Sequence, residues 1–141
     1  KSTEIDVRVP SDPVLLVGDS KSLSEIFTHL LRNAVKFSQE KGKVEVEVKV
    51  MDNGVEVTVS DMGIGIPQDK LDKIFDVFYQ VDSSPARRFE GVGLGLYLVK
   101  KLTALHKGTI RVKSKEGEGT AFSVFIPSGL EKRDAMEVFY D

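Results

Sequence analysis

Apolar and polar residues alternate in five stretches of the chain, which is the pattern of strands that bury one face. These stretches span residues 5–9, 44–50, 55–59, 109–114 and 120–127. The run Asp52-Asn53-Gly54 separates the second stretch from the third and predicts a β-hairpin, because Asn-Gly suits the tightest hairpin turns. The glycine-rich run Glu116–Gly119 predicts a second turn, between the last two strands.

One long stretch has the helical period of 3.6 residues. Its apolar stripe runs from Leu23 to Val35, and Asp19 or Ser20 is placed to cap its start. Gly42 is expected to end this helical region.

A second long helix follows the glycine run at 91–95, and Gly108 is placed as its left-handed cap. Its expected apolar stripe consists of Leu94, Leu98, Leu102 and Leu105. A short helix is predicted around Asp69–Phe75, and the aperiodic segment 81–90 predicts a loop.

Together these elements predict an α+β fold. We expect a two-layer sandwich, in which a mixed sheet of about five strands carries its helices on one face. One domain is expected over residues 1–127, followed by a polar tail over 128–141.

Composition narrows the classes of function. The chain has 141 residues, no cysteine and a formal net charge of −2. Disulfide scaffolds, zinc fingers and thiol catalysis are therefore excluded, and the mildly acidic balance argues against a general nucleic-acid binder. No apolar run approaches the ~20 residues of a membrane span, so we expect a cytoplasmic domain. Few amides beside abundant Lys and Glu are typical of thermophile proteins, a hypothesis that a thermal midpoint below about 60 °C would contradict.

The run Gly91-Val92-Gly93-Leu94-Gly95 indicates a phosphate site. Alternate glycines directly before a helix leave the N–H groups of its first turn uncovered, where the helix dipole favours an anion. The run is not a dinucleotide fingerprint, because Leu96 stands where a third glycine is required, and no P-loop motif occurs in the chain. The alternative is a helix start that packs closely against its neighbours.

Polar residues on the first helix give an independent indication. His29, Asn33 and Lys36 fall within a sector of about 60°, at ~100° per residue, beside the apolar stripe. Asn33 offers an oxygen ligand for Mg²⁺, and Lys36 offers a charge for phosphate. The alternative is a solvated helix flank.

Two further segments carry candidate chemistry. Asp61 ends a strand before Gly63 and Gly65, so its carboxylate is placed to accept from an amine such as that of adenine; the alternative is a turn-forming Asp. Arg87 and Arg88 precede the glycine run and are placed to close on phosphates as a lid; the alternative is an exposed basic pair.

The order and spacing of these segments resemble the ATP-binding catalytic domain of sensor histidine kinases, within the larger group of gyrase-type, chaperone-type and mismatch-repair ATPases. The resemblance covers about residues 4–127. It rests on an N box at 29–37, a glycine box at 61–66, an F box at 75–79, a second glycine box at 91–96 and a Gly-x-Gly-Thr-x-Phe box at 117–122.

This resemblance implies a Bergerat-type ATP-binding fold and a role for each box. Asp61 would receive the adenine amino group, in a base pocket lined by Gly63, Gly65, Ile66 and Thr120. Asn33 would hold Mg²⁺ with His29 beside it, and Lys36 would contact phosphates. The phosphates would also meet Gly91, Gly93, Leu94, Gly95 and Leu96, and Arg87 or Arg88 from an ATP lid at 82–90.

The implied function is a two-component signalling kinase. Such a domain binds Mg-ATP and transfers the γ-phosphoryl group to a histidine on a separate dimerisation and phosphoacceptor domain, for onward transfer to a response regulator. The F box and the lid favour this function over an ATPase of the same group.

The chain departs from the family pattern at positions that leave an alternative function open. His29 stands where Asn is commonest, and Val92 replaces the usual Thr or Ser; a regulatory module that binds nucleotide without phosphotransfer is therefore the alternative. The chain shows no phosphoacceptor motif after His29 or His106. His106 is interpreted as a cation that complements the dipole of the second helix.

Overall fold

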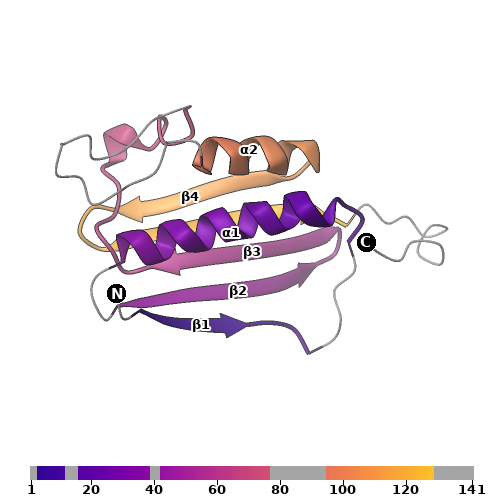
Figure 1. The fold of residues 1–141 in the computed structure, drawn as a ribbon, viewed down its shortest axis with the longest axis horizontal. Coiled ribbons are helices and arrows are strands. Elements are labelled where there is room, and N and C mark those ends of the chain that lie inside the picture. Colours follow the sequence, from indigo (N-terminus) through magenta and orange to yellow (C-terminus); the bar gives the residue numbers. More distant parts are fainter. Residues whose placement is uncertain (1–2, 12–15, 39–41, 77–94, 129–141) are drawn as a thin grey trace.

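The computed structural model describes residues 3–11, 16–38, 42–76 and 95–128 (Figure 1). Its elements follow in the order β1 (Glu4–Arg8), α1 (Ser20–Phe37), β2 (Lys43–Met51), β3 (Gly54–Asp61), the 3₁₀ turn η1 (Gln68–Lys70), α2 (Gly95–Leu105), β4 (Thr109–Lys115) and β5 (Gly119–Pro127). Figure 1 shows both α-helices on the same face of one sheet. The predicted α+β class and two-layer arrangement are therefore confirmed.

The five described strands form one mixed sheet in the order β1-β2-β3-β5-β4. β1 runs parallel to β2, and α1 makes the crossover between them, whereas the other three pairs are antiparallel. Both predicted hairpins are present. In the first, Val50 pairs with Val55 and Met51 with Gly54, so that Asp52 and Asn53 form the turn.

The core lies between the sheet and the two helices. Helix α1 contributes Ile26, Leu30 and Ala34, which recur every four residues and are at most 3% exposed, as its stripe predicted. The sheet contributes the inward residues of its three inner strands: Val44, Val55, Val57, Val59, Phe122, Val124 and Ile126.

The ends of α1 are set by hydrogen bonds. Asp19 caps the start, because its carboxylate accepts from the N–H of Ser22 at 3.1 Å. The helix ends at Phe37, well before the expected Gly42. At Ser38 the backbone becomes extended and forms a β-bridge with Gly63, which takes the chain out of the helix.

Helix α2 differs from its prediction in both face and cap. Its buried residues are Val99 and Thr103, each one position after a leucine of the expected stripe, whereas Leu105 is 76% exposed. The side of the helix that faces the core is therefore rotated by one residue from the predicted side. The left-handed residue is Lys107, with a φ of 61°, and not Gly108. The N–H of Lys107 donates to Ala104 O and that of Gly108 to Thr103 O, both at 2.9 Å, which is the Schellman arrangement.

His106 is hydrogen bonded through both ring nitrogens. Nδ1 lies 2.9 Å from Leu102 O, a pure acceptor, so Nδ1 carries the proton. Nε2 then accepts from the N–H of Asp19 at 3.1 Å. The ring therefore acts as a neutral link from the end of α2 to the start of α1, and not as the cation that the sequence suggested.

The short helix expected around Asp69–Phe75 is wrong in extent. Only Gln68–Lys70 forms a 3₁₀ turn. Beyond it the N–H of Lys73 donates to Lys70 O and that of Asp76 to Lys73 O, both at 3.0 Å. These bonds span three residues, so the segment is a series of turns. Within the described ranges, no helix has the length and apolar character needed to cross a membrane.

Replacing Lys107 by Gly is expected to raise the free energy of unfolding by about 0.5–1 kcal/mol, because glycine adopts positive φ without the steric cost of a side chain. Urea unfolding followed by circular dichroism measures the change. The matched control, Lys101→Gly in the interior of α2, is expected to destabilise the chain by about 1 kcal/mol. Equal destabilisation by both would contradict a left-handed Lys107.

Candidate nucleotide site

Asp61 lies at the end of the central strand β3, directly opposite Thr120 at the start of β5. Both residues are 8% exposed. Oδ1 of Asp61 accepts from the N–H of Gly63 at 2.9 Å, and the carboxylate also accepts from the backbone N–H of Thr120. The alternation of β3 turns Asp61 to the same side as Val57 and Val59, so this carboxylate faces the helices.

The electrostatics of Asp61 are unusual for a carboxylate. Burial raises its pKa above the ordinary value, and the N–H groups of Gly63 and Thr120, which favour the charged form, offset only part of that effect. In the described part of the chain, none of the ion pairs involves Asp61. The structure therefore holds a desolvated acceptor whose charge none of the described basic side chains compensates.

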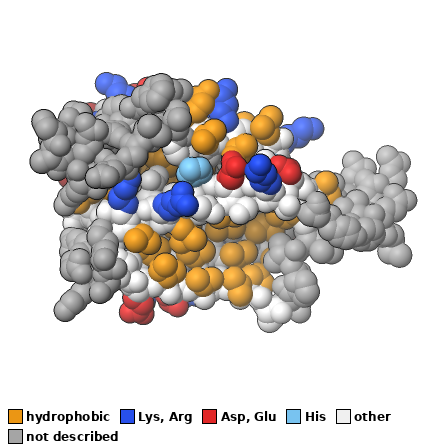
Figure 2. Space-filling view, in the orientation of Figure 1, with side chains coloured by type: hydrophobic (Ala, Val, Ile, Leu, Met, Phe, Trp, Pro, Cys, Tyr) orange, Lys and Arg blue, Asp and Glu red, His pale blue; other side chains and the backbone are white. Residues whose placement is uncertain are grey.

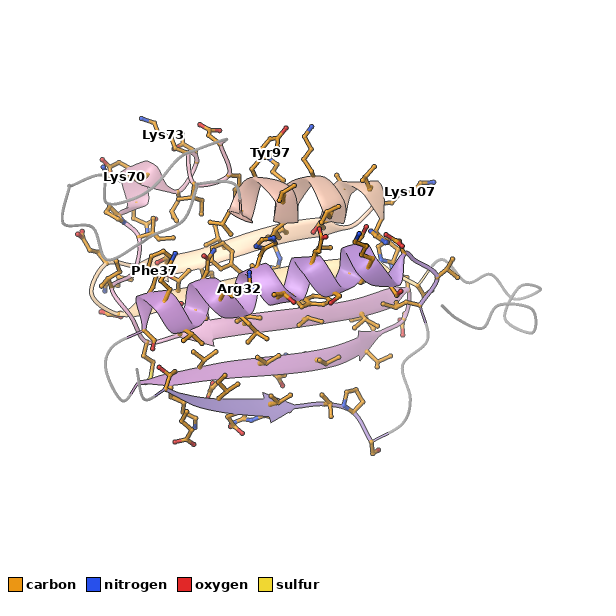
Figure 3. The ribbon with its side chains drawn as sticks, viewed as in Figure 1. Arg32, Phe37, Lys70, Lys73, Tyr97 and Lys107 are labelled. Atoms are coloured by element: carbon orange, nitrogen blue, oxygen red, sulfur yellow. The ribbon has the colours of Figure 1, made fainter. Side chains whose placement is uncertain are left out.

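The glycines after Asp61 are required by close approach. A Cβ on Gly63 would lie 2.0 Å from the carbonyl oxygen of Phe37 at the end of α1. Gly65 has a φ of 71°, and a Cβ there would lie 2.2 Å from Lys115 O at the end of β4. The loop is thus pressed between α1 and the β4–β5 turn. Figure 3 labels Phe37 at this end of α1.

Ser114 links the loop at residues 62–66, the glycine loop, to Thr120, although it was not among the predicted site residues. Its Oγ accepts from the N–H of Ile66 at 2.7 Å, donates to Gly119 O at 2.9 Å and lies 2.8 Å from Thr120 Oγ1. One signal was available in the sequence: Ser114 continues the inward series of Ile110 and Val112, so a polar residue occupies a position where an apolar one is expected.

Of the candidate residues on α1, His29 lies beside the start of α2. His29, Asn33 and Lys36 are all half-buried, and Nδ1 of His29 would lie 3.5 Å from a Cβ placed on Gly95. Figure 2 shows a histidine in a row of basic and acidic side chains on the helical face. This flank therefore borders the first turn of α2, where sequence analysis expected phosphate.

Other predicted site residues lie outside the described residues: Arg87, Arg88, Gly91, Gly93 and Leu94, with the expected lid at 82–90 and the F-box residues from 77 on. Of the predicted site residues that are described, the structure brings Asp61, Gly63, Gly65, Ile66 and Thr120 together at one end of the sheet. It brings His29 and Gly95 together on the helical layer.

A cavity of about 360 Å³ adjoins the back of this site. Its lining includes Asp61 and Thr120, but also Ser60, Lys113 and Ala121. The last three alternate with inward residues of their strands, so the cavity opens on the face of the sheet that carries no described helix.

Comparison with known proteins matches residues 18–130 to the family described as "Histidine kinase-, DNA gyrase B-, and HSP90-like ATPase". The chain is 42% identical, over 132 residues, to an uncharacterized sensor-like histidine kinase of Rhizobium meliloti. That alignment covers 91% of this chain and 25% of the relative, so the chain spans about a quarter of the relative's length.

Solved structures share the fold. The mycobacterial sensor histidine kinase MprB superposes with a TM-score of 0.79 and 34% identity, covering 89% of this chain and 84% of that one. Full-length ShkA in complex with AMPPNP superposes with a TM-score of 0.75 and 30% identity, covering 91% of this chain and 27% of that one.

The raised pKa of Asp61 predicts how stability depends on pH. Between pH 3.8, the ordinary value, and the raised pKa, the folded chain binds more protons than the unfolded chain, so stability falls as pH rises through this window. Asp61→Asn removes the buried charge. We expect it to raise the free energy of unfolding at pH 7 relative to the native chain, and this gain to vanish as the pH falls below 3.8.

Denaturant unfolding at a series of pH values tests this expectation. Asp52→Asn is the matched control, because Asp52 is exposed in the β2–β3 turn and its replacement leaves the buried carboxylate in place. A stability difference between Asp61→Asn and the native chain that stays constant with pH would contradict burial as the cause of the raised pKa.

Proposed function

The chain belongs to the histidine kinase-, DNA gyrase B- and HSP90-like ATPase family, and on that premise we propose that it binds Mg-ATP at the Asp61 end of its sheet and phosphorylates a histidine on a separate domain. The acceptor would be a helical dimerisation and phosphoacceptor domain, and a response regulator would receive the phosphoryl group from it. The observation that carries this proposal is the buried carboxylate of Asp61, which no described basic side chain pairs.

Recognition of the base begins at Asp61. Two carboxylate lone pairs are used by the N–H groups of Gly63 and Thr120, and others are available to the 6-amino group of adenine. Such a bond is charge-assisted, and a desolvated carboxylate makes it stronger than one in water. Gly63, Gly65, Ile66 and Thr120 complete the proposed base pocket. The ShkA structure is described as a complex with the nucleotide analogue AMPPNP, which supports nucleotide binding by a chain of this fold.

The phosphates are proposed to extend along the α1 flank toward the start of α2. Lys36 contributes positive charge, and the first-turn N–H groups of α2 with the positive end of its dipole favour the anion. Gly91, Gly93, Leu94, Gly95 and Leu96 are the proposed backbone contacts, and Arg87 or Arg88 is proposed to reach the γ-phosphate. Phosphoryl transfer requires mainly positioning and charge neutralisation, which is what these groups supply.

Magnesium fits part of the donor set. The amide oxygen of Asn33 is the hard ligand that Mg²⁺ prefers, and Asn33 is half-buried on the flank that borders α2. The imidazole of His29 is a softer donor, so it would lie beside the ion, where it would hydrogen bond to water and not hold the metal itself. When bound, the ion neutralises charge on the β- and γ-phosphates.

The attacking imidazole is proposed to come from another domain. Both nitrogens of His106 are already hydrogen bonded, and it contacts the first residues of α1. The glycine loop contacts the other end of that helix, which has 18 residues and is therefore about 27 Å long. His106 thus lies far from the proposed base pocket.

The central experiment measures both binding and transfer. We expect Asp61→Asn to weaken ATP binding about a hundredfold, because it loses a charge-assisted hydrogen bond and turns a donor toward the adenine amine. With the helical phosphoacceptor domain and γ-labelled Mg-ATP, the native chain is expected to yield acid-labile phosphohistidine, and Asp61→Asn none. Asp52→Asn should behave as the native chain.

Other outcomes point to other functions. ATP binding without phosphohistidine, with the partner present, would favour a regulatory module. Steady phosphate release by the chain alone would favour an ATPase of the same family.

The proposed roles of Asn33 and His29 predict that their variants differ in how Mg²⁺ changes ATP affinity. Asn33→Ala is expected to abolish the increase in ATP affinity that Mg²⁺ produces, because the amide oxygen is lost. His29→Asn should retain most of it, since an amide can also hold a metal-bound water. Calorimetric titration of ATP with and without Mg²⁺ measures the two variants. A Mg²⁺ effect unchanged by Asn33→Ala would contradict the assignment.

A further inference from the structure

The orientation of one hydroxyl proton at the base pocket follows from the partners of Ser114. Its Oγ lies 2.9 Å from Gly119 O, and a carbonyl oxygen only accepts, so the single proton of Ser114 is used there. The N–H of Ile66 donates to the same Oγ at 2.7 Å. The third neighbour is Thr120 Oγ1 at 2.8 Å, and because Ser114 has no proton left, Thr120 must be the donor in that pair.

The hydroxyl proton of Thr120 is therefore used in the hydrogen bond to Ser114. The remaining capacity of Oγ1 consists of lone pairs that accept. Thr120 stands opposite Asp61 in the β3–β5 register, where side chains on the same face are about 4.5–5.5 Å apart at Cβ. Two acceptors, the carboxylate and this hydroxyl oxygen, thus lie side by side with no free hydroxyl proton between them.

We propose that Ser114 is a positioning residue that fixes Thr120 as a hydrogen-bond acceptor and thereby makes the site select adenine over guanine. This inference rests on the proposed nucleotide site. Adenine presents an amino group at position 6, which donates to acceptors. Guanine presents a carbonyl oxygen at that position. This oxygen would face the Asp61 carboxylate and Thr120 Oγ1, which are also acceptors, so no hydrogen bond could form among them.

Loss of the Ser114 hydroxyl weakens this selection. In Ser114→Ala the proton of Thr120 has no partner on β4, so the hydroxyl is free to rotate and donate into the pocket. It would then serve the guanine carbonyl, which the native arrangement does not allow. We expect the ratio of the GTP and ATP dissociation constants to fall about fivefold to tenfold, the size of one neutral hydrogen bond gained and one lost.

The experiment measures both dissociation constants by calorimetry on the 141-residue chain, after thermal melts show that each variant is folded. Ser114→Thr keeps the hydroxyl and should keep the native ratio. Ser123→Ala is the matched control, because it removes a serine hydroxyl that lies 2.9 Å from Thr58 Oγ1 on neighbouring strands, away from Asp61. Should Ser114→Ala not fold, Ser114→Cys, whose thiol is a weak donor and acceptor, serves in its place.

A double-mutant cycle separates positioning from general loosening of the pocket. In a Thr120→Val background the hydroxyl that Ser114 orients is absent. Ser114→Ala should therefore no longer change the ratio of the GTP and ATP dissociation constants. An unchanged ratio in the single variant, or an equal change in the Thr120→Val background, would overturn the role of Ser114 while leaving nucleotide binding intact. Failure of the native chain to bind ATP would instead refute the proposed function.

Discussion

The candidate site depends on the burial of one carboxylate at the end of the central strand. Strand β3 places Val55, Val57 and Val59 in the core, and the next inward position of the same alternation holds Asp61. An apolar residue there would continue the core, whereas a carboxylate must be desolvated to occupy it. Two backbone N–H groups offset part of this cost, and the raised pKa shows that the remainder persists. A charge retained in the core against stability is typical of a binding site.

The loop after Asp61 is held from both layers of the sandwich. The N–H of Ile64 lies 3.4 Å from Phe37 O at the end of α1, and Ile64 O accepts from the N–H of Gly117 in the β4–β5 turn at 2.7 Å. The bridge from Ser38 to Gly63 adds a second link to α1. The early end of α1 and the closeness of the loop are therefore linked, because the carbonyl of Phe37, the last residue of the helix, lies against the backbone of Gly63 and Ile64.

Sequence patterns predicted what depends on local period, and missed what depends on tertiary contact. The α1 stripe, the Asp19 cap and both hairpins followed from periodicity and turn chemistry, because each is set within a few residues. The cap of α2 was misplaced by one residue, since the hydrogen bonds to Ala104 and Thr103 put a lysine in the left-handed position. Ser114 was missed because its partners come from two other segments, 5 and 48 residues away in the chain. The nearness of Asp61 and Thr120 likewise required the register of the sheet.

A contact far from the proposed base pocket also supports the proposed phosphate end of the site. His106 joins the end of α2 to the cap of α1, with its ring fixed by Leu102 O on one side and the N–H of Asp19 on the other. A helix is stiff along its axis, so fixing this end of α2 also fixes the position of its first residue, 11 residues or about 16 Å away. That residue is Gly95, which lies against His29 on the flank of α1. The position of α2 against α1 is thus set at both ends of the helix pair. His106 fixes one end, and the contact of Gly95 with His29 lies at the other.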